Sequence, residues 1–145
     1  MTSNLILLNN SEVDARQLSP LTLAFLGDAV FGLLTRERLV SEADRPVGRL
    51  HELSIKYVSA DAQYGAVKEI MDSLSDEEVS VFKRGRNAHT GRKPKHSTDA
   101  AYHYATGLET LFGYLYLEKR AERISELFDK IYNIINDSGK GNITL

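Results

Sequence analysis

The sequence predicts an all-α fold in a single domain. Apolar residues recur at spacings of three and four along most of the chain, which is the spacing of one helix face. Residues suited to helix starts precede several of these stretches. The chain has no alternating strand pattern and no internal repeat, and its 145 residues suffice for one buried core.

The first half of the chain contains three expected helices. Ser19 and Pro20 suit the N-cap and the first turn of a helix that covers about residues 20–40. Pro46 can occupy the first turn of a second helix, which continues to about residue 59. A third helix covers about residues 60–71, where apolar residues again recur at helical spacing.

A short fourth helix and a basic segment follow. Ser75 and Glu78 have the spacing of a capping box, which predicts a helix that ends near Lys83. The segment 83–96 contains two glycines and a proline, so we expect most of it to be a loop. It is also the one dense run of basic residues in the chain.

Two longer helices complete the predicted fold. Ser97 or Thr98 caps an apolar helix that extends to Leu117. The last helix, over about residues 120–135, is amphipathic, and we expect its apolar stripe to lie in the core: Ile124, Leu127, Phe128, Ile131 and Ile135. The domain core therefore covers about residues 16–135, and the tail 138–145 is expected to be disordered.

Two apolar helices each contain a single acid. Between Leu21 and Leu34 the only polar side chains are Thr22 and Asp28, and Glu109 is the only acid between residues 100 and 117. A helix that is apolar on every face is expected in the interior, where a carboxylate is costly unless a cation or several donors meet it. Each acid alone could also be a partly exposed carboxylate or a buried ion pair. Together, carboxylates from two helices suit Mg²⁺ or Mn²⁺.

Small and aromatic residues in the same two helices predict how they pack. Glycine costs a helix about 1 kcal/mol relative to alanine, so four glycines indicate a close helix crossing near the site: Gly27, Gly32, Gly107 and Gly113. Four tyrosines are interpreted as residues of the core and of a contact with a second copy of the chain, in preference to stacking on a ligand: Tyr102, Tyr104, Tyr114 and Tyr116.

The distribution of charge indicates a polyanionic partner. The net charge is −2, but segment 83–96 holds six of the 18 Lys and Arg and no acid, so the remaining 12 cations face 20 acids, a net charge of −8. A solvated charge run without a partner is the alternative. The chain has no cysteine, which excludes disulfides, zinc–thiolate sites and cysteine nucleophiles. Its N-terminal residues lack the basic region of a secretory signal, so we expect a cytoplasmic protein without a membrane segment.

The run Phe25-Leu26-Gly27-Asp28-Ala29-Val30 resembles the signature of the ribonuclease III family. The stretch Thr106-Gly107-Leu108-Glu109 matches the second family motif, and Arg84-Gly85-Arg86-Asn87-Ala88 lies between the two. With the length of the chain, these motifs resemble the compact bacterial branch of the family, which has only the catalytic domain. The resemblance implies an endoribonuclease that hydrolyses phosphodiester bonds of double-stranded RNA.

The same resemblance implies the roles of individual residues. Asp28 and Glu109 would be the catalytic residues and would hold Mg²⁺, with Mn²⁺ as a substitute. The wider family has acids where this chain has Ala24 and Thr106, so two carboxylates would hold the metal with help from water and phosphate oxygens. Contacts to RNA are assigned to the basic segment: Lys83, Arg84, Arg86, Asn87, Arg92, Lys93 and Lys95.

The resemblance also implies partners. The expected assembly is a homodimer whose two sites cut opposite strands, the expected substrate is the precursor of 23S ribosomal RNA, and ribosomal protein L3 is an expected partner. Two alternatives remain open from the residues: a non-catalytic helical module that binds RNA, favoured by Ala24 and Thr106, and an all-α nucleotide hydrolase that uses Mg²⁺.

Overall fold

The computed structural model describes residues 9–88 and 98–141, and these residues form an all-helical fold, as predicted. Its six α-helices over the described residues are α1 (Pro20–Glu42), α2 (Val47–Val58), α3 (Ala60–Ile70), α4 (Asp76–Arg86), α5 (Asp99–Leu117) and α6 (Ala121–Gly141). Two short 3₁₀ turns that the sequence pattern did not predict precede α1 and α4: η2 (Ala15–Gln17) and η3 (Met71–Ser73).

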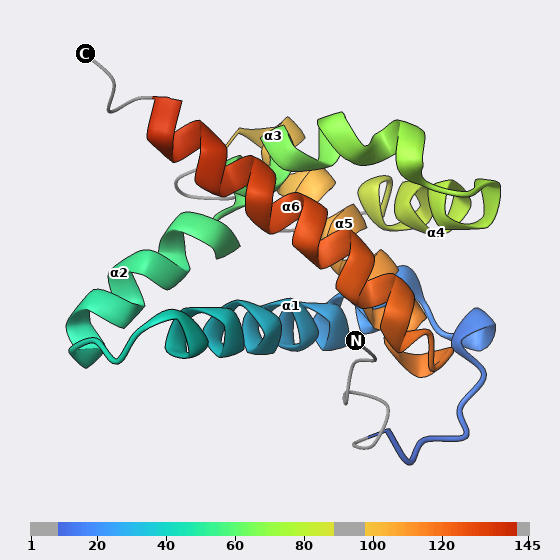
Figure 1. Cartoon of the computed structure of the whole chain (residues 1–145). Coiled ribbons are helices and arrows are strands. Elements are labelled where there is room, and N and C mark those ends of the chain that lie inside the picture. The colour runs from blue at the N-terminus through green and yellow to red at the C-terminus, as the bar shows by residue number, and fades with distance from the viewer. Residues whose placement is uncertain (1–8, 89–97, 142–145) are drawn as a thin grey trace.

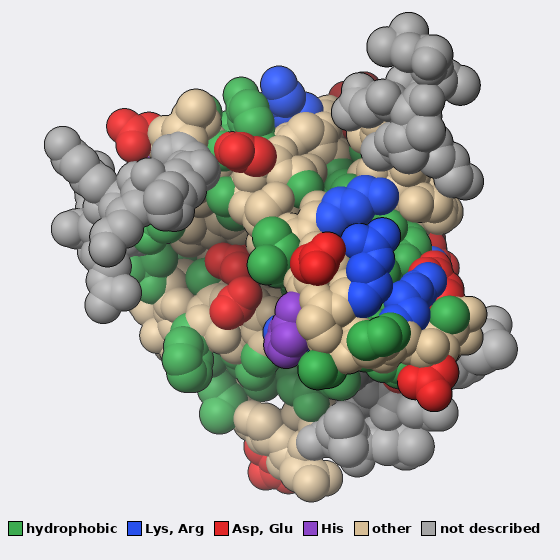
Figure 2. Space-filling view, turned by 90° about the vertical axis from the view of Figure 1, so that its left-hand side faces the viewer, with side chains coloured by type: hydrophobic (Ala, Val, Ile, Leu, Met, Phe, Trp, Pro, Cys, Tyr) green, Lys and Arg blue, Asp and Glu red, His purple; other side chains and the backbone are tan. Residues whose placement is uncertain are grey.

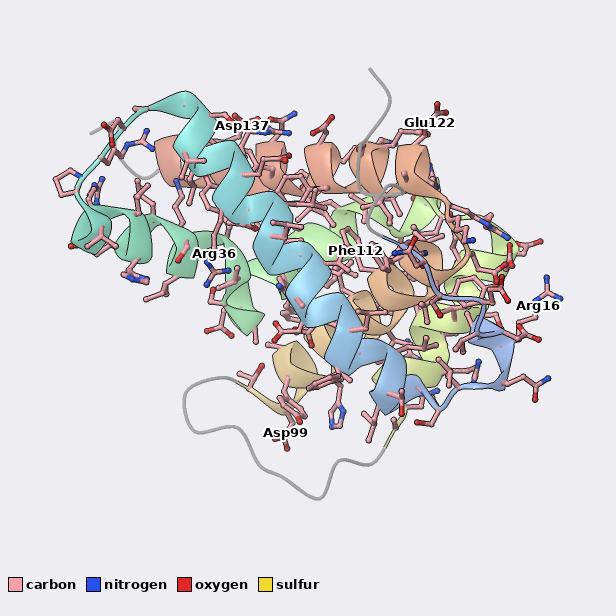
Figure 3. The ribbon with its side chains drawn as sticks, turned by 90° about the horizontal axis from the view of Figure 1, so that it is seen from below. Arg16, Arg36, Asp99, Phe112, Glu122 and Asp137 are labelled. Atoms are coloured by element: carbon pink, nitrogen blue, oxygen red, sulfur yellow. The ribbon has the colours of Figure 1, made fainter. Side chains whose placement is uncertain are left out.

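Helix α5 forms the centre of the fold. It packs most extensively against α1, α4 and α3, and α6 crosses in front of it in Figure 1. Phe112 of α5 lies in the interior behind α1 in Figure 3, where its ring meets Phe31 edge to face with centroids 5.5 Å apart. Phe31 also meets Phe128 of α6 at 5.4 Å, so one aromatic cluster joins the three longest helices. The predicted apolar stripe of α6 is buried in this core, which confirms its assignment: Ile124, Leu127, Phe128, Ile131 and Ile135.

The helix starts follow the side-chain chemistry of the sequence. Ser19, Ser75 and Thr98 are the N-caps of α1, α4 and α5, and each side chain accepts a hydrogen bond from the backbone N–H three residues later. Ser75 and Glu78 form the complete capping box. Pro46 is the N-cap of α2 and not part of its first turn, so the prediction for this helix start was wrong by one residue.

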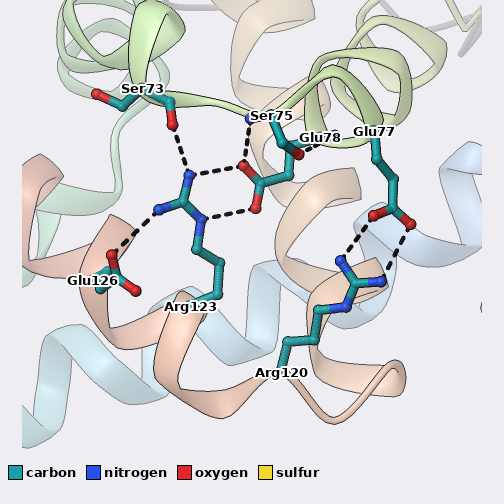
Figure 4. Close-up of polar contacts among 7 residues, drawn as sticks. All are labelled: Ser73, Ser75, Glu77, Glu78, Arg120, Arg123 and Glu126. Carbon is teal, nitrogen blue, oxygen red and sulfur yellow. Dashed lines mark hydrogen bonds and ion pairs between the residues drawn. The ribbon is translucent and has the colours of Figure 1, made fainter.

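Ion pairs hold the first turn of α4 against the start of α6 (Figure 4). Glu78 is only 3% exposed, and Arg123 binds both of its oxygens at 2.8 Å and also donates to the carbonyl of Ser73 at 2.7 Å. The hydrogen bond from Arg123 lowers the pKa of Glu78 in spite of its burial. Arg120 binds Glu77 through two nitrogens, at 2.8 and 3.2 Å. These paired hydrogen bonds from Arg120 and Arg123 therefore hold the start of α4 in a defined orientation relative to α6.

The expectation that α1 lies wholly in the interior is wrong. One side of α1 buries Leu23 and Phe31, which are 0% and 2% exposed. The opposite side leaves Phe25, Leu33 and Val40 exposed, at 85%, 45% and 57%. Among the described helices, α1 packs mainly against α5 and next against α2, and these contacts leave part of its surface uncovered. An all-apolar helix sequence cannot distinguish complete burial from a second apolar face that is left open.

Helix lengths differ from the predictions mainly at α6. This helix continues to Gly141, so residues 138–141 of the expected disordered tail are helical, while residues 142–145 lie outside the described part of the chain. Ile134 and Ile135 pack against the core only one turn earlier, which anchors the last turn. Among the described helices, none combines the length and the apolar character that a membrane span requires.

Candidate active site and its basic border

Helices α1 and α5 cross at two glycines. A Cβ atom added to Gly27 would lie 1.7 Å from the carbonyl oxygen of Glu109, and one added to Gly113 would lie 2.0 Å from a carbonyl oxygen of α1. The two backbones therefore touch without side chains between them. The predicted close crossing is confirmed at these positions, whereas a Cβ on Gly32 would meet only Arg36 of its own helix.

The crossing places the two predicted carboxylates side by side. Asp28 follows Gly27 directly and is exposed, and Glu109 is partly buried. Burial, the hydrogen bond with Asp28 and the negative charge of Asp28 together raise the pKa of Glu109 to about 9, and burial contributes most. At neutral pH without a cation, a protonated Glu109 can thus donate to the Asp28 carboxylate. The interior position expected for Asp28 was wrong, since it lies at the edge of the exposed side of α1.

This carboxylate pair is suited to one divalent cation. A cation between the two groups would offset the cost of a buried negative charge on Glu109 and the repulsion from Asp28, the two effects that raise the pKa of Glu109. Within the described residues, no group of three or more His, Cys, Asp or Glu side chains is arranged to hold a metal. Ala24 and Thr106 are buried, and the Thr106 hydroxyl donates to the carbonyl of Tyr102 at 2.9 Å. Mg²⁺ commonly keeps several waters, so it fits a site with two protein carboxylates.

The helix before the basic segment ends at Arg86, three residues beyond the predicted end near Lys83, and most of the predicted loop lies outside the described residues. Lys83, Arg84 and Arg86 lie in the last turn of α4, and Asn87 is its C-cap. Cations are favoured there by the helix dipole. Within the described residues, none of the three forms an ion pair, although Arg84 donates to the carbonyl of Leu18 at 3.3 Å. The other predicted RNA contacts lie outside the described residues: Arg92, Lys93 and Lys95.

The basic end of α4 packs directly on the part of α5 that carries Glu109. A Cβ on Gly85 would lie 2.1 Å from the hydroxyl oxygen of Thr110, and a Cβ on Gly107 would lie 2.8 Å from Phe82. Gly85 therefore serves this contact and does not end the helix, which explains why α4 extends beyond its predicted end. The basic end of α4 and the carboxylate pair therefore lie on helices that pack closely against α5.

Thr110 is a residue that the sequence prediction missed. Its buried hydroxyl lies 2.8 Å from the carbonyl of Thr106 and 3.1 Å from the carbonyl of Pro20, and it can donate to either. The contact with Pro20 ties the first turn of α1 to α5, one residue after Glu109. A buried hydroxyl in an otherwise apolar helix was the signal, because such a group needs a partner.

The exposed side of α1 is a second feature that the prediction missed. We call Phe25, Leu33 and Val40 the α1 stripe; α2 adds exposed Val47 and Ile55, at 69% and 62%. Figure 2 shows exposed hydrophobic side chains among acidic, basic and histidine side chains on one face of the molecule. Contiguous exposed apolar side chains commonly mark an interaction surface. The α1 stripe borders Asp28, which lies three residues after Phe25 on the same helix.

Comparison with known proteins gives consistent matches. Residues 21–120 match the family model described as the Ribonuclease III domain. A Mini-ribonuclease 3 from Thermoanaerobacter sp. (strain X514) is 42% identical over 134 residues, which cover 90% of this chain and 94% of the relative. A Mini-ribonuclease 3 from Staphylococcus aureus (strain NCTC 8325 / PS 47) is 38% identical over 131 residues, 89% of this chain and 98% of the relative.

The fold also matches a solved structure. An X-ray crystal structure of a protein from Fusobacterium nucleatum is similar with a TM-score of 0.75 and 32% sequence identity. The match covers 83% of this chain and 96% of the other. The similarity therefore extends over most of the helices described above.

Proposed function

Because the chain belongs to the ribonuclease III family, as an endoribonuclease of the Mini-ribonuclease 3 type, we propose that it cleaves double-stranded RNA at the Asp28–Glu109 pair with Mg²⁺. The observation that carries the proposal is the placement of these two carboxylates at the glycine crossing of α1 and α5. The cations at the end of α4, which form no ion pair with any described residue, support it because α4 packs against α5 beside Glu109.

Asp28 and Glu109 would bind the metal through oxygens from two helices. Mg²⁺, or Mn²⁺ in its place, supplies an activated water and stabilises negative charge on the scissile phosphate. Asp28 is exposed and offers its carboxylate directly to solvent and substrate. Glu109 must release its proton before it can bind a cation, because its pKa is raised to about 9.

The basic end of α4 would hold the substrate. Lys83, Arg84 and Arg86 present positive charge without acidic partners among the described residues, and Asn87 adds an amide next to them. Double-stranded RNA is recognised mainly through phosphates, 2′-hydroxyls and shape, which are the groups that such side chains bind. Contacts from Arg92, Lys93 and Lys95 are part of the same proposal.

We further propose a homodimer formed through the α1 stripe. Phe25 is 85% exposed, which is costly for an aromatic side chain unless a partner covers it. A two-fold interface beside Asp28 would place two carboxylate pairs on one face of the assembly. Each pair would then cut one strand, which gives products with a 5′ phosphate, a 3′ hydroxyl and a short 3′ overhang.

The cellular role is proposed from the family resemblance. The substrate would be the precursor of 23S ribosomal RNA, cut near its paired ends in the cytoplasm, with ribosomal protein L3 as a partner. The relatives named Mini-ribonuclease 3, which share about 40% identity over most of the chain, support the resemblance from which this role is proposed.

One assay tests the proposed reaction. The protein is incubated with duplex RNA and, separately, with nucleoside triphosphates, each with and without Mg²⁺. Cleavage of the duplex that requires the metal supports the proposal. Binding without cleavage would favour the RNA-binding module suggested by Ala24 and Thr106, and turnover of nucleotides alone would favour a nucleotide hydrolase.

A further inference from the structure

Four side chains from three helices form a continuous row, which we call the aromatic strip: Lys68, Tyr64, Tyr104 and Arg86. The rings of Tyr64 (α3) and Tyr104 (α5) meet edge to face with centroids 4.9 Å apart. The ammonium nitrogen of Lys68 lies 4.3 Å from the Tyr64 ring centre, and the guanidinium carbon of Arg86 (α4) lies 5.9 Å from that of Tyr104. Both distances are in the range of cation–π attraction.

The aromatic strip reaches the surface and carries positive charge at both ends. Lys68 is exposed, and Tyr64, Tyr104 and Arg86 are partly exposed. In the part of the chain that the structure describes, neither Lys68 nor Arg86 forms an ion pair. The acids on α3 next to the strip, Asp61 and Glu69, line a cavity against Ile134 and Ile135 of α6.

The geometry favours phosphate over nucleobases as the ligand. A base stacks on the open face of an aromatic ring, but here cations lie over the rings, and the two tyrosines pack against each other by their edges. The rings thus hold two cations in place, and their hydroxyls add further hydrogen-bond donors. A row of fixed positive charges with neighbouring hydroxyl donors is suited to a backbone of phosphates and 2′-hydroxyls.

We propose that the aromatic strip is a second contact for the phosphate backbone of double-stranded RNA, which extends the basic end of α4 across α5 onto α3. This inference rests on the proposed function. Arg86 belongs to both surfaces, so an RNA duplex bound at the end of α4 continues along the strip. Tyr104 then acts as a support for an RNA-binding cation, in addition to its packing against Phe82 at 5.5 Å.

The test compares Lys68→Gln with Lys130→Gln, a matched loss of charge at an exposed position on α6. Binding is measured without divalent metal, so that RNA is not cut, over a range of salt concentrations and with a short duplex and one twice as long. For the long duplex, Lys68→Gln should weaken binding several-fold and lower the slope of log affinity against log salt by about one. Lys130→Gln should leave both unchanged.

Tyr64 variants test how the strip works. Tyr64→Leu removes the ring that positions Lys68, so it should weaken binding about as much as Lys68→Gln, whereas Tyr64→Phe keeps the ring and should weaken it less. Thermal unfolding of each variant shows whether the fold is intact.

Four outcomes would overturn the inference. In the first, Lys68→Gln and Lys130→Gln bind the long duplex equally at every salt concentration. In the second, Lys68→Gln weakens the binding of RNA with an unpaired tail but not the binding of duplex RNA. If Arg84→Gln weakens binding while Lys68→Gln does not, the strip is refuted and the proposed function stands. If the wild-type protein binds no duplex RNA, both fail.

Discussion

Gly27 lies so close to α5 that a Cβ atom on it would be 1.7 Å from the carbonyl oxygen of Glu109. This backbone contact between Gly27 and Glu109 determines how closely α1 and α5 approach each other at the candidate site. Because Asp28 is the next residue, the contact fixes the distance between the two carboxylates. Substitutions can therefore separate the position of the carboxylates from their chemistry.

The first prediction concerns this crossing. Gly27→Ala should destabilise the protein by about 2 kcal/mol or more, because the methyl group forces α1 away from α5. Cleavage should fall together with stability, since Asp28 moves away from Glu109. The measurement is chemical unfolding with a parallel cleavage assay. Gly65→Ala is the control, because a Cβ there meets nothing within 4 Å. If the two variants have the same free energy of unfolding and the same cleavage rate, the prediction is refuted.

The second prediction concerns pH in the absence of metal. Burial and Asp28 raise the pKa of Glu109 from its ordinary value of 4.5 to about 9. Between these two pH values, Glu109 keeps its proton in the folded protein but loses it in the unfolded chain. The free energy of unfolding should therefore decrease as pH rises through this range. Glu109→Gln removes this dependence and should be more stable than wild type at pH 8 by several degrees in Tm, with little difference near pH 4.5.

Thermal unfolding with a chelator at several pH values measures this effect. Glu122→Gln, which changes an exposed acid at the start of α6, should follow the wild-type pH profile. If the stability difference between wild type and Glu109→Gln does not vary with pH, the raised pKa is not a property of the folded protein.

The third prediction concerns metal binding. Because Glu109 gives up a proton when it binds a cation, the affinity for Mg²⁺ should rise up to about tenfold per pH unit below pH 9. Titration calorimetry in buffers of different ionisation enthalpy counts the released protons. An affinity that is constant between pH 6 and pH 8.5, with no proton release, would contradict the assignment of Glu109 as a ligand.

The fourth prediction concerns the α1 stripe. Phe25→Glu places a charge on the proposed two-fold interface, where it would meet its own copy, so the variant should be monomeric while the wild type is dimeric. Analytical ultracentrifugation measures the assembly state. Val13→Glu is the control, because Val13 is an exposed apolar residue that precedes η2 and lies outside the α1 stripe. A dimeric Phe25→Glu would exclude the stripe as the interface.

Local signals in the sequence predicted most of the fold. The N-caps at Ser19 and Ser75 and the apolar stripe of α6 depend on residues a few positions apart, and the structure confirms them. The errors concern properties that depend on distant partners. Glycine often marks the end of a helix, but Gly85 lies within α4 because it allows close contact with Thr110. Helix α4 therefore continues through the first basic residues.

The sequence predicted that Asp28 and Glu109 lie close together, but it did not predict how exposed each carboxylate is. The motifs around Asp28 and Glu109 located both carboxylates, and the glycines predicted the close crossing between them. The exposure of Asp28 could not be predicted, because the apolar pattern of α1 is the same whether its outer face meets a second helix or remains open. The aromatic strip joins three helices, so no local pattern reveals it.

The most direct test of the central claim is cleavage by Asp28→Asn. The substitution keeps the size of an exposed side chain, so the protein should fold and bind duplex RNA as the wild type does. It removes one of the two carboxylates proposed to bind the metal, so Mg²⁺-dependent cleavage should be lost, while Asp44→Asn, in the exposed connection between α1 and α2, should cleave normally. Cleavage by Asp28→Asn at a rate near that of the wild type would contradict the account.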